Sequence, residues 1–497
     1  MSADYLAFDL GGSGGRLVRG RFDGRRLNLE TVHSFGNEPV AVGDCLYWDL
    51  FGIYRELKAG IGKAAAASAA ADASEVPRSI GFDSFSNDFA FIDRCGELLT
   101  PLRCYRDERT ERHKTAIYAR MQPERLYEIT GNQIAPFNTL MQLAAMREAG
   151  QGHILDNAYK MLFTPDLLVH FLTGEAVTEY TMASVSQLHD IHTGLWSPEI
   201  LAAFSLPRGM FCDIVPPGTI VGKTRRSCDA ELGLSGLSVT AACEHDTASA
   251  FLAATSEGNR AIISSGTWSL VGTEVDSPII SESGYRHNIA NEGGFGGRNR
   301  LLRNVMGLWI IQELRRQDRG QGKQWSFAEL EEAAASAAPF AHSIDPDDPA
   351  YYAPEDMATT IARHCLERTG KAPSTMGETL RCILESLAFK YRWAVEKLEE
   401  MTGRPITLIH IVGGGSNNRL LCQFTANASG LPVLAGPTDA SALGNILVQL
   451  LADRQISSIE EGKRLIADSF RIEEHAPSGI DEWNERYGQF KLAFDLD

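Results

Sequence analysis

Two loops of small residues, each between apolar strand-like runs, constrain the fold most. Residues 9–16 read Asp-Leu-Gly-Gly-Ser-Gly-Gly-Arg, after the apolar run 5–8 and before the apolar run 17–22. Residues 264–269 read Ser-Ser-Gly-Thr-Trp-Ser and are flanked by apolar runs in the same way. A hairpin of this kind can turn backbone N–H groups onto phosphate oxygens. Two such hairpins in different halves of the chain predict two lobes of similar topology facing one ligand.

Each loop alone also fits a hairpin without a ligand. Glycine is common in turns because it tolerates positive φ, and Ser, Gly and Thr are ordinary turn formers. Neither loop therefore establishes a binding site by itself.

A third glycine-rich turn follows the buried strand expected at residues 406–412. Three glycines, 413–415, lead into a segment with helical apolar spacing that is predicted to stop at Gly430. A strand that is followed by a turn of residues without side chains and then by a helix N-terminus is typical of nucleotide sites. Asn417 or Asn418 could cap the helix or bind the ligand. Neither the GxGxxG fingerprint nor a GxxxxGK[ST] P-loop occurs.

Residues 239–252 supply the candidate chemistry. An apolar run breaks at the polar residues 244–247 and continues as a helix of small residues, which places Asp246 near the helix start beside His245 and Thr247. A carboxylate at the end of a strand is a suitable general base. The alternative, that Asp246 is a helix N-cap and His245 a satisfied core histidine, stays open at this point.

Together these residues resemble the FGGY family of carbohydrate kinases, and within it the rhamnulokinases. The resemblance runs from Tyr5 to about Gly444. It is dense at residues 105–107, 136–140, 245–250, 264–270, 291–294, 304–309, 410–415 and 440–445.

The resemblance implies an α/β chain with two RNase H-like lobes of the actin-like ATPase fold and a catalytic cleft between them. Residues 1–256 would form an N-terminal lobe with the sugar site and the base, and residues 257–497 a C-terminal nucleotide lobe. The expected activity is ATP-dependent phosphorylation of a ketose, L-rhamnulose to L-rhamnulose 1-phosphate. The alternatives are another ketose (L-fuculose, L-xylulose or ribulose) or a non-catalytic sugar or nucleotide sensor.

The resemblance also implies roles for individual residues. Asp246 would be the catalytic base, and Asp9 would lie near Mg²⁺. The implied substrate-binding residues are Ser86, His245, Asp246, Thr247 and Asn304. The implied ATP-binding residues are Gly12, Ser13, Gly14, Gly15, Arg16, Thr267, Gln312 and Gly414.

One segment departs from the rhamnulokinase pattern. Where those enzymes usually carry Asp-Thr-Trp-Gly-Val-Asp-Phe, residues 83–89 read Asp-Ser-Phe-Ser-Asn-Asp-Phe. Phe85, Ser86 and Asn87 could reshape the sugar pocket, because unmatched buried polar groups are costly. Alternatively, Phe85 fills the space of the tryptophan while the two polar residues face solvent.

Composition narrows the classes of partner. The 497 residues exceed one typical core, and a net charge of −17 without a basic cluster argues against nucleic acid or an anionic membrane as partner. We expect a cytoplasmic protein, monomeric or homodimeric, since no apolar stretch could span a bilayer and the first strand begins within five residues. The nine cysteines lack CxxC spacing and are expected to be thiols, with Cys365 and Cys382 close in space.

Other proteins with the actin-like fold are chaperones and sugar-responsive repressors. We expect no repressor helix-turn-helix, because four residues precede Tyr5, and no chaperone substrate domain, because few residues follow Asn445.

Overall fold

The computed structural model describes residues 3–71, 76–234, 236–320, 322–352 and 354–497, which form two compact units. Unit 1 contains Met1–Thr255, Glu274–Leu301 and Ser441–Ser469, and unit 2 contains Ser256–Thr273, Leu302–Ala440 and Phe470–Asp497. The chain therefore passes from one unit to the other five times.

Unit 1 is built on a six-stranded sheet of order β13-β14-β6-β1-β2-β3. Its strands are β1 (Ala3–Leu10), β2 (Gly14–Phe22), β3 (Leu27–Gly36), β6 (Ser79–Ser84), β13 (Thr219–Lys223) and β14 (Ser238–Ala241). β1 to β3 are antiparallel, whereas β6 is parallel to β1 and β14 is parallel to β6. The carboxyl ends of β1, β6 and β14 therefore meet at one edge of the sheet.

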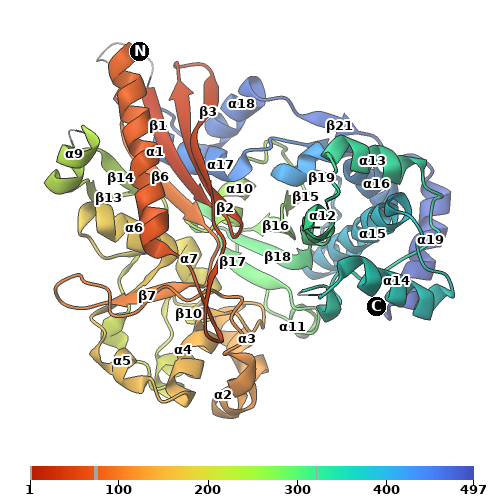
Figure 1. Cartoon of the computed structure of the whole chain (residues 1–497), viewed down its shortest axis with the longest axis horizontal. Coiled ribbons are helices and arrows are strands. Elements are labelled where there is room, and N and C mark those ends of the chain that lie inside the picture. Colours follow the sequence, from red (N-terminus) through yellow and green to blue (C-terminus); the bar gives the residue numbers. More distant parts are fainter. Residues whose placement is uncertain (1–2, 72–75, 235, 321, 353) are drawn as a thin grey trace. The chain divides into compact units, whose positions relative to one another are not determined.

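Helices pack on this sheet, and apolar side chains of helices and strands together form the core between them. α1 (Leu50–Ala71) packs on β2 and β3, as Figure 1 shows, and α6 (Thr164–Thr173) and α10 (Asp246–Leu252) pack on β6. α1 presents Ile53, Leu57 and Ile61, at helical spacing, to the buried Phe8 and Leu17 of the sheet.

A second cluster of helices in unit 1 lies within residues 100–217. Its helices are α2 (Lys114–Arg120), α3 (Pro123–Thr130), α4 (Thr139–Glu148), α5 (Gly152–Asn157), α7 (Tyr180–Val185) and α8 (Pro198–Ala203). They enclose their own apolar core, with β7 (Phe89–Ile92) paired antiparallel to β8 (Lys160–Phe163).

The other large sheet has seven strands in the order β17-β18-β16-β15-β19-β20-β21. These strands are β15 (Arg260–Ser265), β16 (Trp268–Val275), β17 (Ala290–Gly293), β18 (Asn299–Met306), β19 (Leu408–Val412), β20 (Val433–Ala435) and β21 (Glu473–His475). β15 and β16 form an antiparallel hairpin, and β19 and β20 continue parallel to β15. The order β18-β16-β15-β19-β20 repeats that of β3-β2-β1-β6-β14, so the expected similarity of topology is confirmed.

Helix ends in unit 2 follow the sequence signals. α15 (Met376–Thr402) begins after the N-cap Thr375 and ends at Gly403, and α16 (Arg419–Ser429) begins after the N-cap Asn418 and ends at Gly430. Both glycines adopt the left-handed conformation that terminates a helix. The remaining long helices are α12 (Trp309–Gly320), α13 (Phe327–Ser336), α14 (Met357–Thr369) and α19 (Ile480–Ala493) of unit 2, and α17 (Ala440–Ala452) and α18 (Ile459–Ser469), which lie almost wholly in unit 1.

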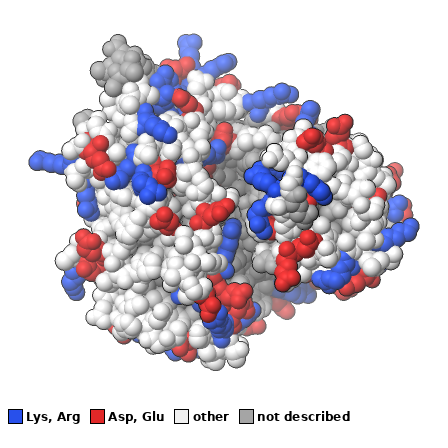
Figure 2. All heavy atoms as spheres, viewed as in Figure 1, with Lys and Arg blue, Asp and Glu red and all other residues white. Residues whose placement is uncertain are grey.

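All nine cysteines are free thiols, and the sulfur atoms of Cys365 and Cys382 lie 3.9 Å apart, as expected. In the described part of the chain, no helix is long and apolar enough to cross a membrane. On the face drawn in Figure 2, basic and acidic side chains are interspersed over both units.

Candidate active site

The hairpin between β1 and β2 carries the first glycine-rich loop. The Gly11 N–H donates to the Gly14 carbonyl at 2.8 Å, and Asp9 pairs with Arg16 across the two strands. Arg16 Nη2 lies 2.8 Å from Asp9 Oδ2, and both side chains remain partly exposed. The structure thus brings the predicted metal residue and a predicted phosphate residue together as an ion pair.

The space around this loop requires glycine at several positions. None of those at positions 11, 12, 14 and 15 has a positive φ. A Cβ atom on Gly15 would lie 2.3 Å from the Phe35 ring, and one on Gly12 would lie 3.2 Å from Arg106 Nη2. The loop therefore presents backbone rather than side chains, which suits close approach of a phosphate.

Asp83 lies next to Asp9 in the parallel register of β1 and β6. Its Oδ2 accepts a hydrogen bond from Asn445 at 2.7 Å, while no described group donates one to its Oδ1. Burial raises the pKa of Asp83 well above its usual value, and the nearby charges of Asp9 and Asp246 raise it further. Three carboxyl groups therefore lie near one another at this edge of the sheet.

These carboxylates suit a hard cation. No group of three or more His, Cys, Asp or Glu among the described residues forms a complete metal site. Mg²⁺ keeps several waters and is usually bound by one or two carboxylates together with substrate phosphates. Asp9, with Asp83 beside it, fits that requirement.

Asp246 is the first residue of α10, which follows β14 after the short connection 242–245. The N-cap position belongs to His245, whose side chain makes no capping hydrogen bond, so the interpretation of Asp246 as a cap is not supported. Thr247 Oγ1 donates to Asp246 Oδ1 at 3.1 Å, and the Asp246 side chain remains 34 % exposed. Desolvation raises the pKa of Asp246, while the nearby His245 acts to lower it.

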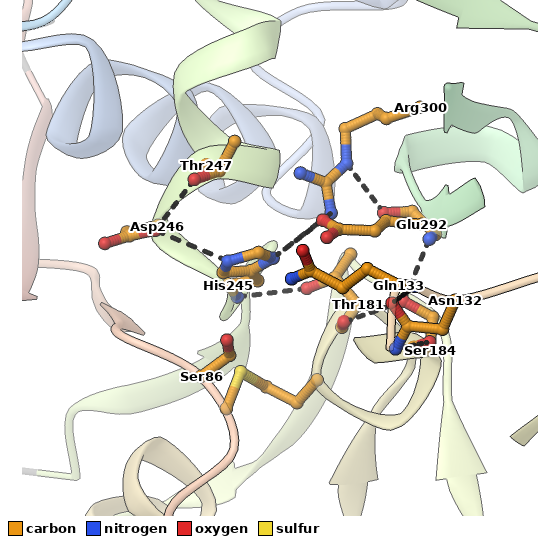
Figure 3. A network of polar contacts seen from close by, with 12 residues as sticks. Ser86, Asn132, Gln133, Thr181, Ser184, His245, Asp246, Thr247, Glu292 and Arg300 are labelled. Atoms are coloured by element: carbon orange, nitrogen blue, oxygen red, sulfur yellow. Dashed lines mark hydrogen bonds and ion pairs between the residues drawn. The ribbon is translucent and has the colours of Figure 1, made fainter. Parts of the chain in front are cut away.

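His245 is enclosed by charged groups that the sequence analysis did not identify. Its Nε2 lies 3.6 Å from Asp246 Oδ1, and its Nδ1 lies 3.2 Å from Arg300 Nη2 and 3.4 Å from Glu292 Oε2. A line of contacts therefore runs from Thr247 through Asp246 and His245 to Arg300 (Figure 3). Glu292 and Arg300 are fully buried as an ion pair at 3.0 Å.

A second buried network fixes the backbone of the same segment. The carboxylate of Glu179 caps α7 by accepting hydrogen bonds from the Thr181 and Met182 amides, and it also accepts the Glu244 amide at 3.2 Å. Thr181 Oγ1 in turn accepts the His245 amide at 3.0 Å. The turn that presents His245 and Asp246 is thus attached to α7.

Three carboxyl groups meet behind this turn. Asp166, Glu179 and Glu244 are wholly buried. Burial raises the pKa of Asp166 to about 8 and that of Glu179 to about 7, and it raises the pKa of Glu244 well above its usual value. Burial therefore makes these groups keep their protons to a higher pH than exposed carboxyl groups do.

One interpretation of this departure had Phe85 filling the space of a tryptophan while Ser86 and Asn87 face solvent; in the structure Phe85 and Asn87 are buried and Ser86 is half-buried. Phe85 is 8 % exposed and packs on Trp48, with ring centroids 4.7 Å apart. Asn87 is 4 % exposed with a φ of 74°, and its Oδ1 accepts the Thr139 amide at 3.2 Å. Its Nδ2 donates to Ser86 Oγ at 3.1 Å, and the Ser86 side chain points toward His245 in Figure 3.

Unit 2 brings its own predicted residues together. Thr267 lies in the turn between β15 and β16, and its hydroxyl donates to Gln312 in the first turn of α12 at 3.2 Å. The Trp309 amide donates to the Thr267 carbonyl, which attaches the start of α12 to this turn. Asn304, on β18, has a buried Oδ1 that accepts no hydrogen bond from the described residues.

The third glycine turn lies against the same hairpin. Cβ atoms on Gly413 and Gly415 would lie 3.0 and 2.0 Å from atoms of Ser265, whereas one on Gly414 would meet open space. Gly414 therefore leaves room for a ligand beside the strand end. Asn418 caps α16 through the Leu421 amide, and Asn417 accepts a hydrogen bond from Thr438.

The sequence-predicted residues thus fall into two groups. Unit 1 holds Asp9, Gly12, Ser13, Gly14, Gly15, Arg16, Ser86, His245, Asp246 and Thr247, and unit 2 holds Thr267, Asn304, Gln312 and Gly414. The sequence analysis missed the roles of Asp83, Glu179, Glu292 and Arg300. The sequence signal that could have identified such residues is a charged residue within an apolar strand segment, such as Arg300 before Leu301 and Leu302.

Comparison with known proteins identifies the family. Residues 5–253 match the N-terminal domain, and residues 261–452 the C-terminal domain, of the FGGY family of carbohydrate kinases. The chain is 37 % identical over 495 residues to the rhamnulokinase of Bacteroides thetaiotaomicron, covering 99 % of each chain. It is 36 % identical to that of Enterococcus faecalis, covering 99 % of this chain and 98 % of the relative.

The fold comparison agrees. The structure matches a ligand-bound xylulose kinase from Lactobacillus acidophilus with a TM-score of 0.80 and 15 % identity, covering 100 % of this chain and 99 % of the other. The two-domain α/β fold is therefore that of the FGGY sugar kinases. Family matches over most of both halves, with near full-length relatives above 30 % identity, show that the chain belongs to the FGGY family of carbohydrate kinases.

Proposed function

We propose that the chain phosphorylates L-rhamnulose with ATP, giving L-rhamnulose 1-phosphate and ADP. The near full-length similarity to rhamnulokinases supports this substrate. The observation that carries the chemistry is Asp246, a partly exposed carboxylate at the start of α10 beside His245.

Asp246 is proposed as the general base. The sugar C1 hydroxyl oxygen would form a bond to the γ-phosphorus while the bond to the bridging oxygen of ADP breaks, and the hydroxyl proton would pass to Asp246. The raised pKa of Asp246 brings its basicity closer to neutral pH, which favours proton transfer. Thr247 donates to one carboxylate oxygen and leaves the other for the substrate.

The remaining predicted roles stay proposals. Ser86, His245, Thr247 and Asn304 would contact the sugar, and the unsatisfied Oδ1 of Asn304 is available to accept a ligand hydroxyl. The phosphates would be bound by residues 12–16 and Thr267, and the nucleotide by Gln312 and Gly414. Residues 1–256 would supply most of the sugar lobe and residues 257–497 most of the nucleotide lobe, although residues 274–301 and 441–469 belong to unit 1.

Mg²⁺ would be held beside Asp9. When bound with ATP, it neutralises charge that develops on the transferred phosphoryl group. Arg16, which is paired with Asp9 in the structure, would contact phosphate when the cation is held beside Asp9, while Asn445 would keep Asp83 in place.

A panel of ketoses assayed for ADP release tests the proposal. We expect the highest kcat/KM with L-rhamnulose, and ³¹P NMR of the product should show a 1-phosphate ester. L-fuculose, L-xylulose and both ribulose enantiomers are the comparison sugars. If the kcat/KM of another ketose exceeds that of L-rhamnulose tenfold, the proposed substrate is wrong but the proposed kinase activity is not. If no ketose is phosphorylated, the chain is a sensor rather than an enzyme.

A further inference from the structure

Arg300 contacts the His245 ring at the nitrogen that does not face Asp246 (Figure 3). Arg300 lies on β18, is 1 % exposed, and donates from Nε to the Gly293 carbonyl at 2.9 Å. Its Nη2 lies 3.0 Å from Glu292 Oε2 and 3.2 Å from His245 Nδ1. A single guanidinium nitrogen is therefore directed at both the carboxylate and the imidazole.

The donor chemistry of arginine determines what His245 can do. A guanidinium has only donors, so His245 Nδ1 must be the acceptor in this contact. A neutral imidazole that accepts at Nδ1 carries its proton on Nε2. Nε2 is the atom 3.6 Å from Asp246 Oδ1, so the proton lies on the side of the proposed base.

Glu292 keeps this arrangement in place. Burial is the largest influence and would raise the pKa of Glu292, but the contacts with Arg300 and His245 together outweigh it and lower the pKa, so the carboxylate stays ionised and paired. Without Arg300, Glu292 Oε2 at 3.4 Å from Nδ1 would instead accept a proton from that nitrogen. His245 would then present a lone pair at Nε2 toward the Asp246 carboxylate, and the two would repel each other.

We propose that Arg300, paired with Glu292, is a positioning residue that fixes His245 as the Nε2–H tautomer beside Asp246. This inference rests on the proposed function, because the Nε2–H group would donate to the sugar oxygen bound next to the base. Arg300 acts through His245 and does not itself contact the substrate.

The decisive variant removes both charges together. Arg300→Met alone would leave Glu292 as a buried unpaired charge, which is strongly destabilising. The pair Arg300→Met and Glu292→Leu replaces the ion pair by apolar groups of similar size, which proteins often tolerate. The matched control is Arg381→Met with Glu385→Leu, which removes another largely buried pair, on α15 of unit 2.

Two measurements test the proposal. The first is ¹⁵N NMR of histidine-labelled protein at pH about 8, where an ordinary imidazole is neutral, with His245 assigned from a His245→Asn variant. The wild type and the control should carry the His245 proton on Nε2, and the Arg300/Glu292 double variant should populate both tautomers.

The second measurement is steady-state kinetics with L-rhamnulose. In the Arg300/Glu292 double variant, kcat should fall about 10- to 100-fold, since misplaced catalytic geometry costs rates of that order, while the KM for ATP changes less than threefold. The control should keep its kcat. A proton on Nδ1 in the wild type, or a folded double variant with kcat within threefold, would overturn the proposal. Because the NMR readout needs no turnover, it still decides the tautomer if L-rhamnulose is not the substrate.

Discussion

Asn87 belongs to the segment that departs from the rhamnulokinase pattern. The sequence predicts that this segment, residues 85–87, could reshape the sugar pocket. In the structure the Asn87 side-chain oxygen accepts a hydrogen bond from the Thr139 amide, and its side-chain nitrogen donates one to the Ser86 hydroxyl. Any effect on sugar choice from this segment is therefore expected from Phe85 and Ser86.

The backbone of Asn87 predicts a clear ranking of substitutions. Its φ of 74° lies in the left-handed region, which asparagine and glycine tolerate and β-branched residues do not. Asn87→Val should lower the free energy of unfolding by about 3 kcal/mol, through strain and lost buried hydrogen bonds. Asn87→Gly loses the hydrogen bonds without the strain and should cost about half as much.

Thermal unfolding of the two Asn87 variants checks this ranking, because each kcal/mol shifts the midpoint by a few degrees in a protein of this size. A valine variant as stable as the glycine variant would mean that the backbone here is not held in the left-handed region.

At the scale of elements, α17 packs on α10 through a glycine. A Cβ atom on Gly444 would lie 1.8 Å from the carbonyl oxygen of Ser249, a backbone atom that cannot rotate away. Gly444→Ala should therefore displace α10, whose first residue is Asp246, and destabilise the protein by about 3 kcal/mol or more.

Gly62→Ala is the matched control for this prediction. Gly62 lies inside α1, and a Cβ atom there would meet nothing within 4 Å. This change should be neutral or stabilising by up to about 1 kcal/mol, because alanine is the better helix former. Thermal melts and kcat of both variants test this prediction. Equal melting temperatures for the two variants would show that α17 and α10 can move apart at little cost in free energy.

The buried carboxyl cluster predicts a pH dependence of stability. The pKa values of Asp166 and Glu179 are raised in the folded state to about 8 and about 7. Between the ordinary carboxyl pKa and these values the folded state binds more protons at these two groups than the unfolded state, so their contribution to stability is fully present below the ordinary carboxyl pKa and is lost as pH rises through about 7 to 8. The slope is about 1.4 kcal/mol per pH unit for each proton lost.

Asp166→Asn tests this dependence because it does not titrate, while it keeps one of the two oxygen acceptors that serve the Phe163 and Glu179 amides. The free energy of unfolding of this variant should fall less steeply than that of the wild type between pH 5 and 8. Identical slopes would show that Asp166 is already ionised in the folded protein.

Elements were predicted better than contacts. The glycine turn and the stop at Gly430 located α16 because these signals act within a few residues, and the repeated hairpin pattern predicted the similar topology of the two sheets. Arg300 and Glu292 could not be assigned from sequence. Their effect depends on contacts with His245, which for Arg300 is 55 residues away in the sequence, and no local periodicity encodes such contacts.

At the scale of the whole molecule, unit 1 is not one continuous segment. It includes Ser441–Ser469, whose Asn445 bonds Asp83 and whose Gln449 bonds the Leu6 carbonyl. A fragment of residues 1–256 would leave these buried polar groups of β1 and β6 without partners.

We therefore expect the fragment 1–256 to aggregate or to lack a cooperative thermal transition. Joining residues 441–469 to it through a flexible linker should restore a cooperative transition. A cooperative melt of the shorter fragment alone would show that α17 and α18 are dispensable for the fold of unit 1.

The central claim is that Asp246 takes the proton in sugar phosphorylation, and Asp246→Asn tests it most directly. The substitution keeps shape and the Thr247 contact but removes the base. Calorimetry should show that L-rhamnulose and ATP bind the variant nearly as tightly as the wild type, while kcat falls by about two to four orders of magnitude. An Asn variant that turns over within threefold of the wild type would contradict the mechanism.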